Sequence, residues 1–246
     1  MKKNLVTLSL VFLFNLTEGF SQLQPSENLQ MGISSVEGRA YDEAVNYLTQ
    51  YLNTDPENAI ARYNRGIAYY FLQRFDDART DATSAIQSNP NFPTAYNLRG
   101  LARTALNLYD EALLDFTQAI DLDLNYGEAF MNRGLVYKLQ KEYSLAISDF
   151  NSSLNVSQTL LDAYYYRAEV LVEMQNYNEA INDLNIYIQN ISNRASAFST
   201  RGIAYYQLGK FNEAASDFET AIRLNPNLEN DFSHLLNDAK NRSTNK

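Results

Sequence analysis

The sequence contains no cysteine and a single histidine, His234, among its 246 residues. Without cysteine the chain has no disulfide, no thiolate nucleophile and no thiolate metal ligand. One histidine leaves almost nothing for imidazole-based metal binding or acid–base catalysis. No Gly-x-Ser-x-Gly, phosphate-loop, paired-histidine or metal-ligand spacing is present. The sequence therefore predicts no catalytic residue, no metal site and no cofactor.

Positive charge is also scarce, since 20 Lys and Arg face 29 Asp and Glu and the net charge is −9. An acidic chain is repelled by nucleic acid and by anionic membrane surfaces. We therefore expect neither of them as a partner. Hydrophobic residues make up 45% of the chain, which is ordinary for a folded protein.

Only one long apolar run occurs, Leu5–Leu16, near the N-terminus. Lys2 and Lys3 precede it, and Gly19 and Ser21 follow at the −3 and −1 positions of a cleavage site, so the first 21 residues are predicted to be a secretory signal peptide. As a helix the run rises only about 18 Å, short of a bilayer core of roughly 30 Å. An uncleaved anchor is the alternative, and stable membrane insertion is not expected.

Cleavage after Ser21 removes two lysines and one glutamate and leaves a net charge of −10. No cysteine follows the apolar run, so the exported chain is not a lipoprotein. We expect a periplasmic or extracellular protein of a bacterial cell envelope, working as part of an envelope-associated complex.

The hexapeptide RGIAYY occurs twice, at Arg65–Tyr70 and at Arg201–Tyr206, 136 residues or four times 34 apart. A fixed interval of this size is typical of repeat architectures. After a short segment, 22–24, six units of 34 residues fill the chain without insertion or deletion: 25–58, 59–92, 93–126, 127–160, 161–194 and 195–228.

Three positions of the 34-residue frame agree almost throughout. Position 20 is alanine and position 17 is aromatic in all six units, and position 8 is glycine except for Ala168. Apolar residues at spacings of three and four predict two helices in each unit. Small residues at positions 8 and 20 let the two helix axes approach closely.

This pattern resembles the tetratricopeptide repeat, and the resemblance covers residues 25–228. It implies an all-α fold, a right-handed α-solenoid of six helix–turn–helix repeats. The irregular first unit is expected to form an N-terminal cap, and a stripe of apolar residues over 229–240 predicts a C-terminal capping helix before a tail, 241–246. The fifth unit departs from the pattern with Tyr187, where a small residue is usual.

Arginine at position 7 and aspartate at position 23 appear together in units two to six and are both missing from the first, which has Met31 and Tyr47. Pairing within a unit gives each of these residues a partner. Pairing of an aspartate with the arginine of the next unit leaves two of them, Arg65 and Asp217, without one. The preferred prediction is therefore five structural ion pairs between the two helices of a unit, with an anion-binding arginine ladder as the alternative. The pairs are Arg65–Asp81, Arg99–Asp115, Arg133–Asp149, Arg167–Asp183 and Arg201–Asp217.

The family resemblance implies that ligands bind the concave face of the first helices, at positions 2, 5, 9 and 12. Lys138 is the only cation among these side chains, so the lysine-rich carboxylate clamp of chaperone-binding relatives is missing. Three carboxylates stand there, Glu128, Asp162 and Glu169. Such a groove suits an extended peptide or a helix with apolar anchors and basic residues. The predicted groove residues are Tyr63, Ile67, Tyr70, Asn97, Leu101, Met131, Leu135, Lys138, Tyr165, Glu169 and Tyr206.

Three function classes follow. The first is a non-catalytic scaffold that binds a protein or peptide partner of unknown identity. The second is a glycan-binding module in which Tyr63, Tyr70, Tyr165 and Tyr206 are stacking platforms. The third, an enzyme, has no recognisable motif. A further interpretation of the apolar groove residues is that they merely pack between neighbouring first helices and bind no partner.

Overall fold

The computed structural model describes residues 27–244, so the predicted signal peptide, the segment 22–24 and the start of the first repeat lie outside the described residues. The described chain is all-α and contains thirteen α-helices, one 3-10 turn and no strand. The helices are α1 Glu27–Glu37, α2 Tyr41–Leu52, α3 Ala59–Phe71, α4 Phe75–Ser88, α5 Pro93–Ala105, α6 Tyr109–Leu122, α7 Gly127–Leu139, α8 Tyr143–Val156, α9 Leu161–Glu173, α10 Tyr177–Asn190, α11 Ala195–Gln207, α12 Phe211–Leu224 and α13 Glu229–Thr244.

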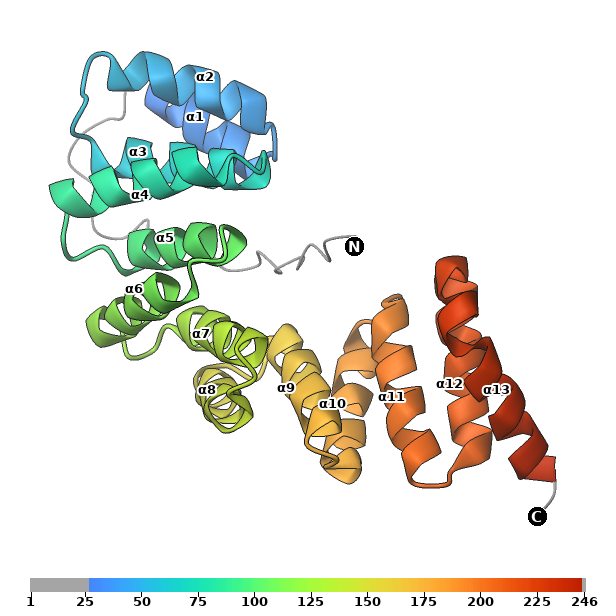
Figure 1. Cartoon of the computed structure of the whole chain (residues 1–246). Helices are drawn as coiled ribbons and strands as arrows, with labels where there is room; N and C mark the ends of the chain where they lie inside the picture. The colour runs from blue at the N-terminus through green and yellow to red at the C-terminus, as the bar shows by residue number, and fades with distance from the viewer. Residues whose placement is uncertain (1–26, 245–246) are drawn as a thin grey trace. The chain divides into compact units, whose positions relative to one another are not determined.

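The helices form two compact units, which divide between Val136 and Tyr137, inside α7. In the N-terminal unit successive helices from α1 to α6 pack on one another, and α3 also contacts α1 and α5. In the C-terminal unit the same holds from α8 to α13, and α9 also contacts α11. Figure 1 shows the helices of each unit following one another in chain order and alternating direction. Each repeat is thus a pair of helices, and first helices contact first helices of neighbouring repeats.

A residue in the left-handed conformation turns the chain between the two helices of every repeat. It stands at position 15, with φ between 60° and 70°, and only the sixth repeat has glycine there. In the third repeat the amides of Asn107 and Leu108 bond back to Thr104 O and Arg103 O at 3.0 and 2.8 Å. These bonds close the first helix in a Schellman motif. The position-15 residues are Arg39, Gln73, Asn107, Lys141, Gln175 and Gly209.

The small residues of the frame lie where the two helices of a repeat touch. The alanine at position 20 is fully buried in all six repeats. A Cβ atom on Gly100 would stand 2.7 Å from the ring of Phe116, and one on Gly202 would stand 2.9 Å from the ring of Phe218. Real Cβ contacts are not this short, so the third and sixth repeats require glycine at position 8, opposite the phenylalanine at position 24.

The C-terminal helix α13 covers the last repeat. It follows a short 3-10 turn, Pro226–Leu228, and packs on α12. The ring of Phe232 stacks on Phe218 at 5.4 Å, and Ala239 is fully buried. The helix runs to Thr244, four residues beyond the predicted end of the cap, and Arg242 in its last turn pairs with Asp238 one turn earlier at 2.7 Å.

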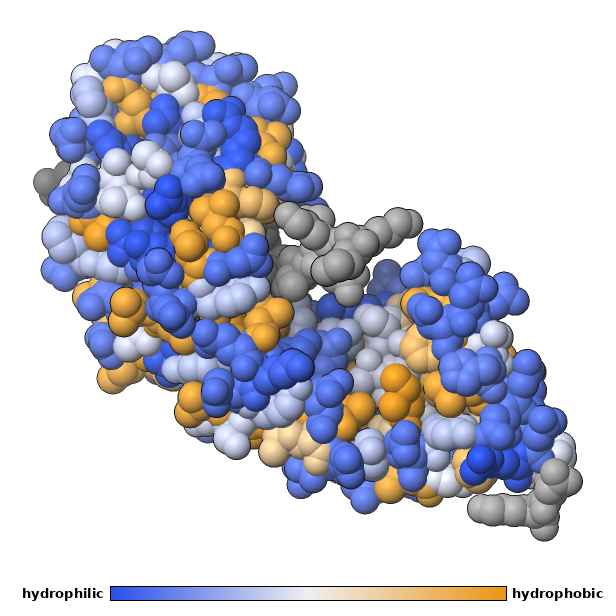
Figure 2. Space-filling view, in the orientation of Figure 1, coloured by the Kyte–Doolittle hydropathy of each residue, from blue (hydrophilic) through white to orange (hydrophobic). Residues whose placement is uncertain are grey.

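No helix of the part that the structure describes is both long enough and apolar enough to cross a bilayer. On the faces visible in Figure 2, the surface of each unit is largely hydrophilic, with separate apolar patches.

Candidate functional site

In four repeats the arginine at position 7 holds the aspartate at position 23 of its own repeat through its Nε and Nη2 groups. Arg201 Nε and Nη2, for example, donate to Asp217 Oδ2 and Oδ1 at 2.7 and 2.8 Å. The aspartate side chains are 3–7% exposed and the arginine side chains 16–20%. The within-repeat scheme therefore describes Arg65–Asp81, Arg99–Asp115, Arg167–Asp183 and Arg201–Asp217. Arg133–Asp149 stays a prediction, because its two residues belong to different units.

Four of the five position-7 arginines, Arg133 among them and Arg99 excepted, also hold the preceding repeat, which the sequence pattern did not predict. Their Nη1 atoms donate to a Thr or Asn at position 25 of the repeat before, at 2.6–3.1 Å. The bonds are Arg65–Thr49, Arg133–Thr117, Arg167–Asn151 and Arg201–Asn185. A signal existed, since position 25 is Thr or Asn in the first five repeats and Glu219 in the sixth, which no repeat follows.

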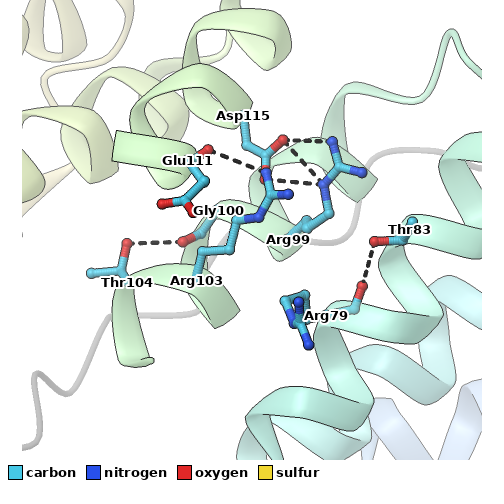
Figure 3. A network of polar contacts seen from close by, with 8 residues as sticks. All are labelled: Arg79, Thr83, Arg99, Gly100, Arg103, Thr104, Glu111 and Asp115. Atoms are coloured by element: carbon cyan, nitrogen blue, oxygen red, sulfur yellow. Dashed lines mark hydrogen bonds and ion pairs between the residues drawn. The ribbon is translucent and has the colours of Figure 1, made fainter. Parts of the chain in front are cut away.

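The third repeat uses a second arginine (Figure 3). Arg103 Nη1 donates to Asp115 Oδ2 at 2.6 Å and to the carbonyl oxygen of Glu111 at 3.2 Å, while Arg99 holds the same carboxylate. Thr83, which occupies position 25 of the repeat before, donates instead to Arg79 O within its own helix at 2.7 Å. Asp115 therefore closes the two helices of its repeat with two guanidinium groups.

These contacts assign the repeated arginines to the scaffold. In each of the four within-repeat pairs a carboxylate takes up two of the guanidinium donors, which leaves little for a bound anion. The first repeat has Met31 and Tyr47 at the two positions, and no described helix precedes α1. The position-7 arginine is thus missing from the repeat that has no described repeat before it.

The predicted groove residues divide into a buried and a half-buried group. Six of them are only 2–7% exposed, namely Tyr63, Ile67, Asn97, Met131, Leu135 and Tyr165. Tyr63 and Ile67 show the reason, because they belong to an apolar cluster with Ala95 and Leu98 of the neighbouring first helix, α5. Packing between first helices thus accounts for them. The surface that a partner could touch is formed by the half-buried group, Tyr70, Leu101, Lys138, Glu169 and Tyr206.

The four tyrosines of the glycan alternative all pack against other side chains. The ring of Tyr63 lies 4.9 Å from that of Phe92, and Tyr70 lies 5.5 Å from Phe75. Tyr206 lies 5.6 Å from Phe211 and donates its hydroxyl to Asp238. Tyr165 is only 3% exposed. Sugar stacking needs a free ring face, which burial takes away from Tyr63 and Tyr165, whereas Tyr70 and Tyr206 stay half-buried.

Arg194 organises the first-helix face of the C-terminal unit. Its guanidinium carbon lies 3.8 Å above the ring centre of Tyr165. Its Nη1 atom donates to Asp162 Oδ1 and to the hydroxyl of Tyr187, both at 3.0 Å. Tyr187 is 2% exposed, so the tyrosine that departs from the family pattern serves as a buried acceptor for this arginine. The contact combines an ion pair with a cation–π interaction.

A second set of polar contacts continues from this arginine. Tyr165 donates its hydroxyl to Glu169 Oε1 at 2.7 Å, and Lys138 Nζ pairs with the other carboxylate oxygen. The Tyr165 hydroxyl also lies 3.0 Å from Ser196 Oγ. Burial, followed by the charge of Glu169, raises the pKa of Tyr165 well above its ordinary value, so the phenol remains a donor. The groove cation Lys138 is therefore already paired within the chain.

Sequence reasoning missed Arg194, although its position carried a signal. Position 34 is Phe92, Tyr126 and Leu160 in the second to fourth repeats, and only the fifth repeat has a charge there. Phe92 packs on the position-5 tyrosine of its own repeat, and Arg194 stacks on Tyr165 in the same way. A charged residue at a position that is apolar in the second to fourth repeats, together with an unusual Tyr187, indicated a polar substitute for an aromatic contact.

These pairs change the charge expected of the groove. Asp162 is neutralised by Arg194 and Glu169 by Lys138, so two of the three predicted carboxylates are already compensated. Glu128 forms no ion pair with any residue that the structure describes. Within residues 27–244, no three His, Cys, Asp or Glu side chains are grouped so that they could hold a metal ion.

Models of the tetratricopeptide repeat match most of the chain. They cover residues 29–81, 64–123 and 97–155 in overlapping segments, then 162–190 and 195–228. The last of these matches has the same bounds as the sixth repeat. No curated protein sequence matches the chain.

Solved structures with the same fold include proteins of different kinds. The Cut9–Hcn1 hetero-tetramer of APC/C is similar with a TM-score of 0.76 and 18% identity over 86% of this chain, which spans 42% of that one. PilW, a type IV pilus biogenesis factor, has a TM-score of 0.68 and 20% identity, and the match covers 84% of this chain and 92% of PilW. YrrB, described as having an unusual peptide-binding site, has a TM-score of 0.59 and 20% identity, and the match covers 73% of this chain and 92% of YrrB. At these identities the likeness concerns the fold.

Proposed function

Since this chain belongs to the tetratricopeptide repeat family, we propose that it is an exported, non-catalytic scaffold for protein–protein interaction. Its first helices bind an extended peptide or a helix of a partner protein. The observation that carries the proposal is the division of the first-helix face into a buried layer and a half-exposed layer. The buried layer fixes the helices, and the half-exposed layer offers side chains to a partner.

The half-exposed layer has the chemistry of a peptide-binding surface. In the N-terminal unit it includes Tyr70, Leu101 and Thr104, and in the C-terminal unit Val172 and Ile203. Apolar and hydroxyl-bearing side chains of this kind bury the apolar anchors of a bound segment and hydrogen-bond its backbone. Because the helices beneath are already packed, little ordering entropy is lost on binding, which favours affinity.

Relatives of the same fold support a protein partner. YrrB is described as having a peptide-binding site, and Cut9–Hcn1 as a hetero-tetramer. PilW is described as a pilus biogenesis factor. For this chain the predicted signal peptide supports export to the periplasm or the cell exterior. We place its work within a complex of the bacterial envelope. No observation favours the glycan alternative over this proposal.

Comparative capture tests the proposal. The protein would be immobilised and exposed to envelope extract, and bound proteins would be quantified by mass spectrometry for the wild type, Leu101→Gln and Leu114→Gln. Leu101 is half-buried on the first helix of repeat 3, whereas Leu114, on the second helix of that repeat, is 70% exposed. We expect one protein to be lost with Leu101→Gln and kept with Leu114→Gln. A partner lost equally with both variants, or only with Leu114→Gln, contradicts binding at the first helices.

A further inference from the structure

One junction between repeats lacks the hydrogen bond that the other four share. At those four junctions the position-7 arginine donates from Nη1 to the Thr or Asn at position 25 of the preceding repeat. At the junction of repeats 2 and 3, Arg99 uses Nε and Nη2 for Asp115 and forms no hydrogen bond to repeat 2 among residues 27–244. Thr83, the position-25 residue, donates to the carbonyl oxygen of Arg79 in its own helix instead (Figure 3).

A second arginine accounts for the missing bond. In the four other repeats with the position-7 arginine, position 11 is tyrosine or leucine, namely Tyr69, Tyr137, Leu171 and Tyr205. The third repeat has Arg103 there, and its Nη1 donates to Asp115 Oδ2 at 2.6 Å. Arg99 Nε then lies 3.0 and 3.1 Å from the two oxygens of that carboxylate, whereas Arg201 Nε lies 2.7 Å from one oxygen of its own. Because two guanidinium groups share one carboxylate, Arg99 binds it differently and does not bond Thr83.

The helix on the other side of the junction also departs from the repeat pattern. Position 21 is apolar in the five other repeats, which have Val45, Leu113, Ile147, Ile181 and Ala215. Val45 packs against a cluster that contains Ala61 and Ala68 of the next first helix, α3. Repeat 2 has Arg79 at this position, which pairs with Asp76 of its own helix at 2.9 Å. At positions 21 and 25, α4 therefore lacks the apolar side chain and the hydrogen bond with which other second helices hold the next repeat.

Apolar contacts hold α4 on α5. Ala82, Ala85 and Ile86 of α4 form one buried cluster with Ala95 and Leu98 of α5. Hydrophobic contact has no preferred direction, whereas a hydrogen bond to a charged group fixes the relative position of its two partners. Helices that pack in this way can slide on one another by small amounts. The junction of repeats 2 and 3 is thus less constrained than the other four.

This junction lies within the half-exposed layer of the N-terminal unit. Tyr70 belongs to the first helix of repeat 2 and Leu101 to the first helix of repeat 3, and both side chains are half-buried. The two helices that carry them, α3 and α5, contact each other. Movement of α5 on α4 therefore changes the distance between Tyr70 and Leu101, two side chains that a bound segment would touch together.

We propose that the junction of repeats 2 and 3 is a hinge of the N-terminal unit, at which the first-helix face adjusts its spacing to the bound partner segment. Arg103 keeps this junction movable, because it shares Asp115 with Arg99 and so prevents the bond from Arg99 to Thr83. The hinge itself rests on the missing bond, whereas its use in binding rests on the proposed function. The two parts are tested separately.

Distances between spin labels test the hinge, and the lack of native cysteine allows labels at chosen sites. Cysteines would replace Thr80 and Leu114, the exposed position-22 residues of repeats 2 and 3, in the full chain. The matched control has its labels at position 22 of repeats 5 and 6, on Asn182 and Ser216, which are also exposed. The control junction has the hydrogen bond that the junction of repeats 2 and 3 lacks. Double electron–electron resonance measures the distribution of each distance.

We expect a broader distribution across repeats 2 and 3 than across repeats 5 and 6. Arg103→Tyr, which introduces the residue of repeats 2, 4 and 6, should narrow it to the width of the control, because Arg99 can then bond Thr83. The population at displaced distances should fall about fivefold, the change that one hydrogen bond makes in an equilibrium. Thr83→Ala should restore the broad distribution in the Arg103→Tyr protein and leave the wild type unchanged. Arg103→Leu, which introduces the residue of repeat 5, should act as Arg103→Tyr does.

Equal widths at the two junctions of the wild type overturn the hinge. A narrowing by Arg103→Tyr that persists when Thr83→Ala is added overturns the role of the missing bond. The use of the hinge is tested with a short peptide that is selected from a random library against the full chain and loses binding with Leu101→Gln. This peptide should narrow the distribution across repeats 2 and 3 and leave the control distribution unchanged.

A bound peptide without this effect overturns adaptation at the hinge and leaves the proposed function standing. If no peptide with this behaviour is found, the proposed function and the use of the hinge in binding fail together. The spin-label comparison of the free protein still decides whether the hinge exists.

Discussion

Replacing Arg201 by alanine tests how the repeats hold together. Arg201 joins two partners at once, since it forms two bonds to Asp217 in its own repeat and one from Nη1 to Asn185 of the preceding repeat at 2.7 Å. The arginine side chain is 17% exposed and the aspartate side chain 7%. Removal of the arginine therefore leaves a largely buried carboxylate without a partner.

The magnitude follows from that burial. Stranding one member of a fully buried ion pair costs about 3–5 kcal/mol, whereas exposed pairs contribute roughly 0.2–1 kcal/mol. For a pair with one end buried and the other partly exposed, we expect Arg201→Ala to lower the free energy of unfolding by about 2–3 kcal/mol. Asn185→Ala should cost about 1 kcal/mol, the value of one hydrogen bond to a charged group that remains partly solvated.

Urea unfolding monitored by circular dichroism would give these free energies, and hydrogen exchange in α10 and α11 would localise the effect. The double mutant Arg201→Ala with Asp217→Ala should be less destabilised than the sum of the single mutants, by about 1–2 kcal/mol. The control cycle pairs Arg201 with Asp183, which Arg167 already holds at 2.6 Å. Equal coupling in both cycles, or additivity in both, would refute the within-repeat assignment.

Three further predictions concern stability. Glu128→Gln should stabilise the protein by about 0.5 kcal/mol at neutral pH. The gain should vanish in acid, because the pKa of this carboxyl is raised in the folded state and the protein loses stability as the pH rises through that pKa. Melting scans across pH measure the effect, and a gain in acid instead would contradict it. Gln175→Gly should raise stability by about 0.5–1 kcal/mol, because φ is 62° at this exposed position and only glycine adopts it without strain; a lower melting temperature would exclude this reading. Deletion of 229–246 should cost about 3–5 kcal/mol and cause self-association, since Phe232 and its neighbours then leave α12 uncovered; light scattering would detect the association, and an unchanged monomer would show that α13 is no cap.

The fold was predictable because its determinants recur. Glycine or alanine at position 8 and alanine at position 20 repeat every 34 residues, and each sits where two helices touch. The arginine of position 7 and the aspartate of position 23 could be paired by counting, because they appear and disappear together. A periodic signal of this kind survives in a single sequence, since six copies report on the same local environment.

The site was less predictable because its determinants are single residues. Arg194 and Tyr187 each occur once, so periodicity gave no guide to the contact between them, which lies at 3.0 Å. The buried half of the groove depended on how closely neighbouring first helices pack. That spacing brings Phe92 to Tyr63, and no pattern within one helix contains it. The turn between the two helices was expected near position 15, but its left-handed conformation was not, because five of the six repeats carry a residue other than glycine there.

Site-specific photo-crosslinking tests the central claim most directly, namely that a partner binds the first-helix face. A photoreactive residue would replace Leu101 or Val172 on first helices, and Leu114 or Ile186 on second helices as controls. Leu114 is 70% exposed and Ile186 38%, so nonspecific encounters favour the controls over the half-buried test positions. The account predicts one discrete crosslinked partner from Leu101 and Val172 and none from Leu114 and Ile186. A discrete adduct only from the second-helix positions would contradict it.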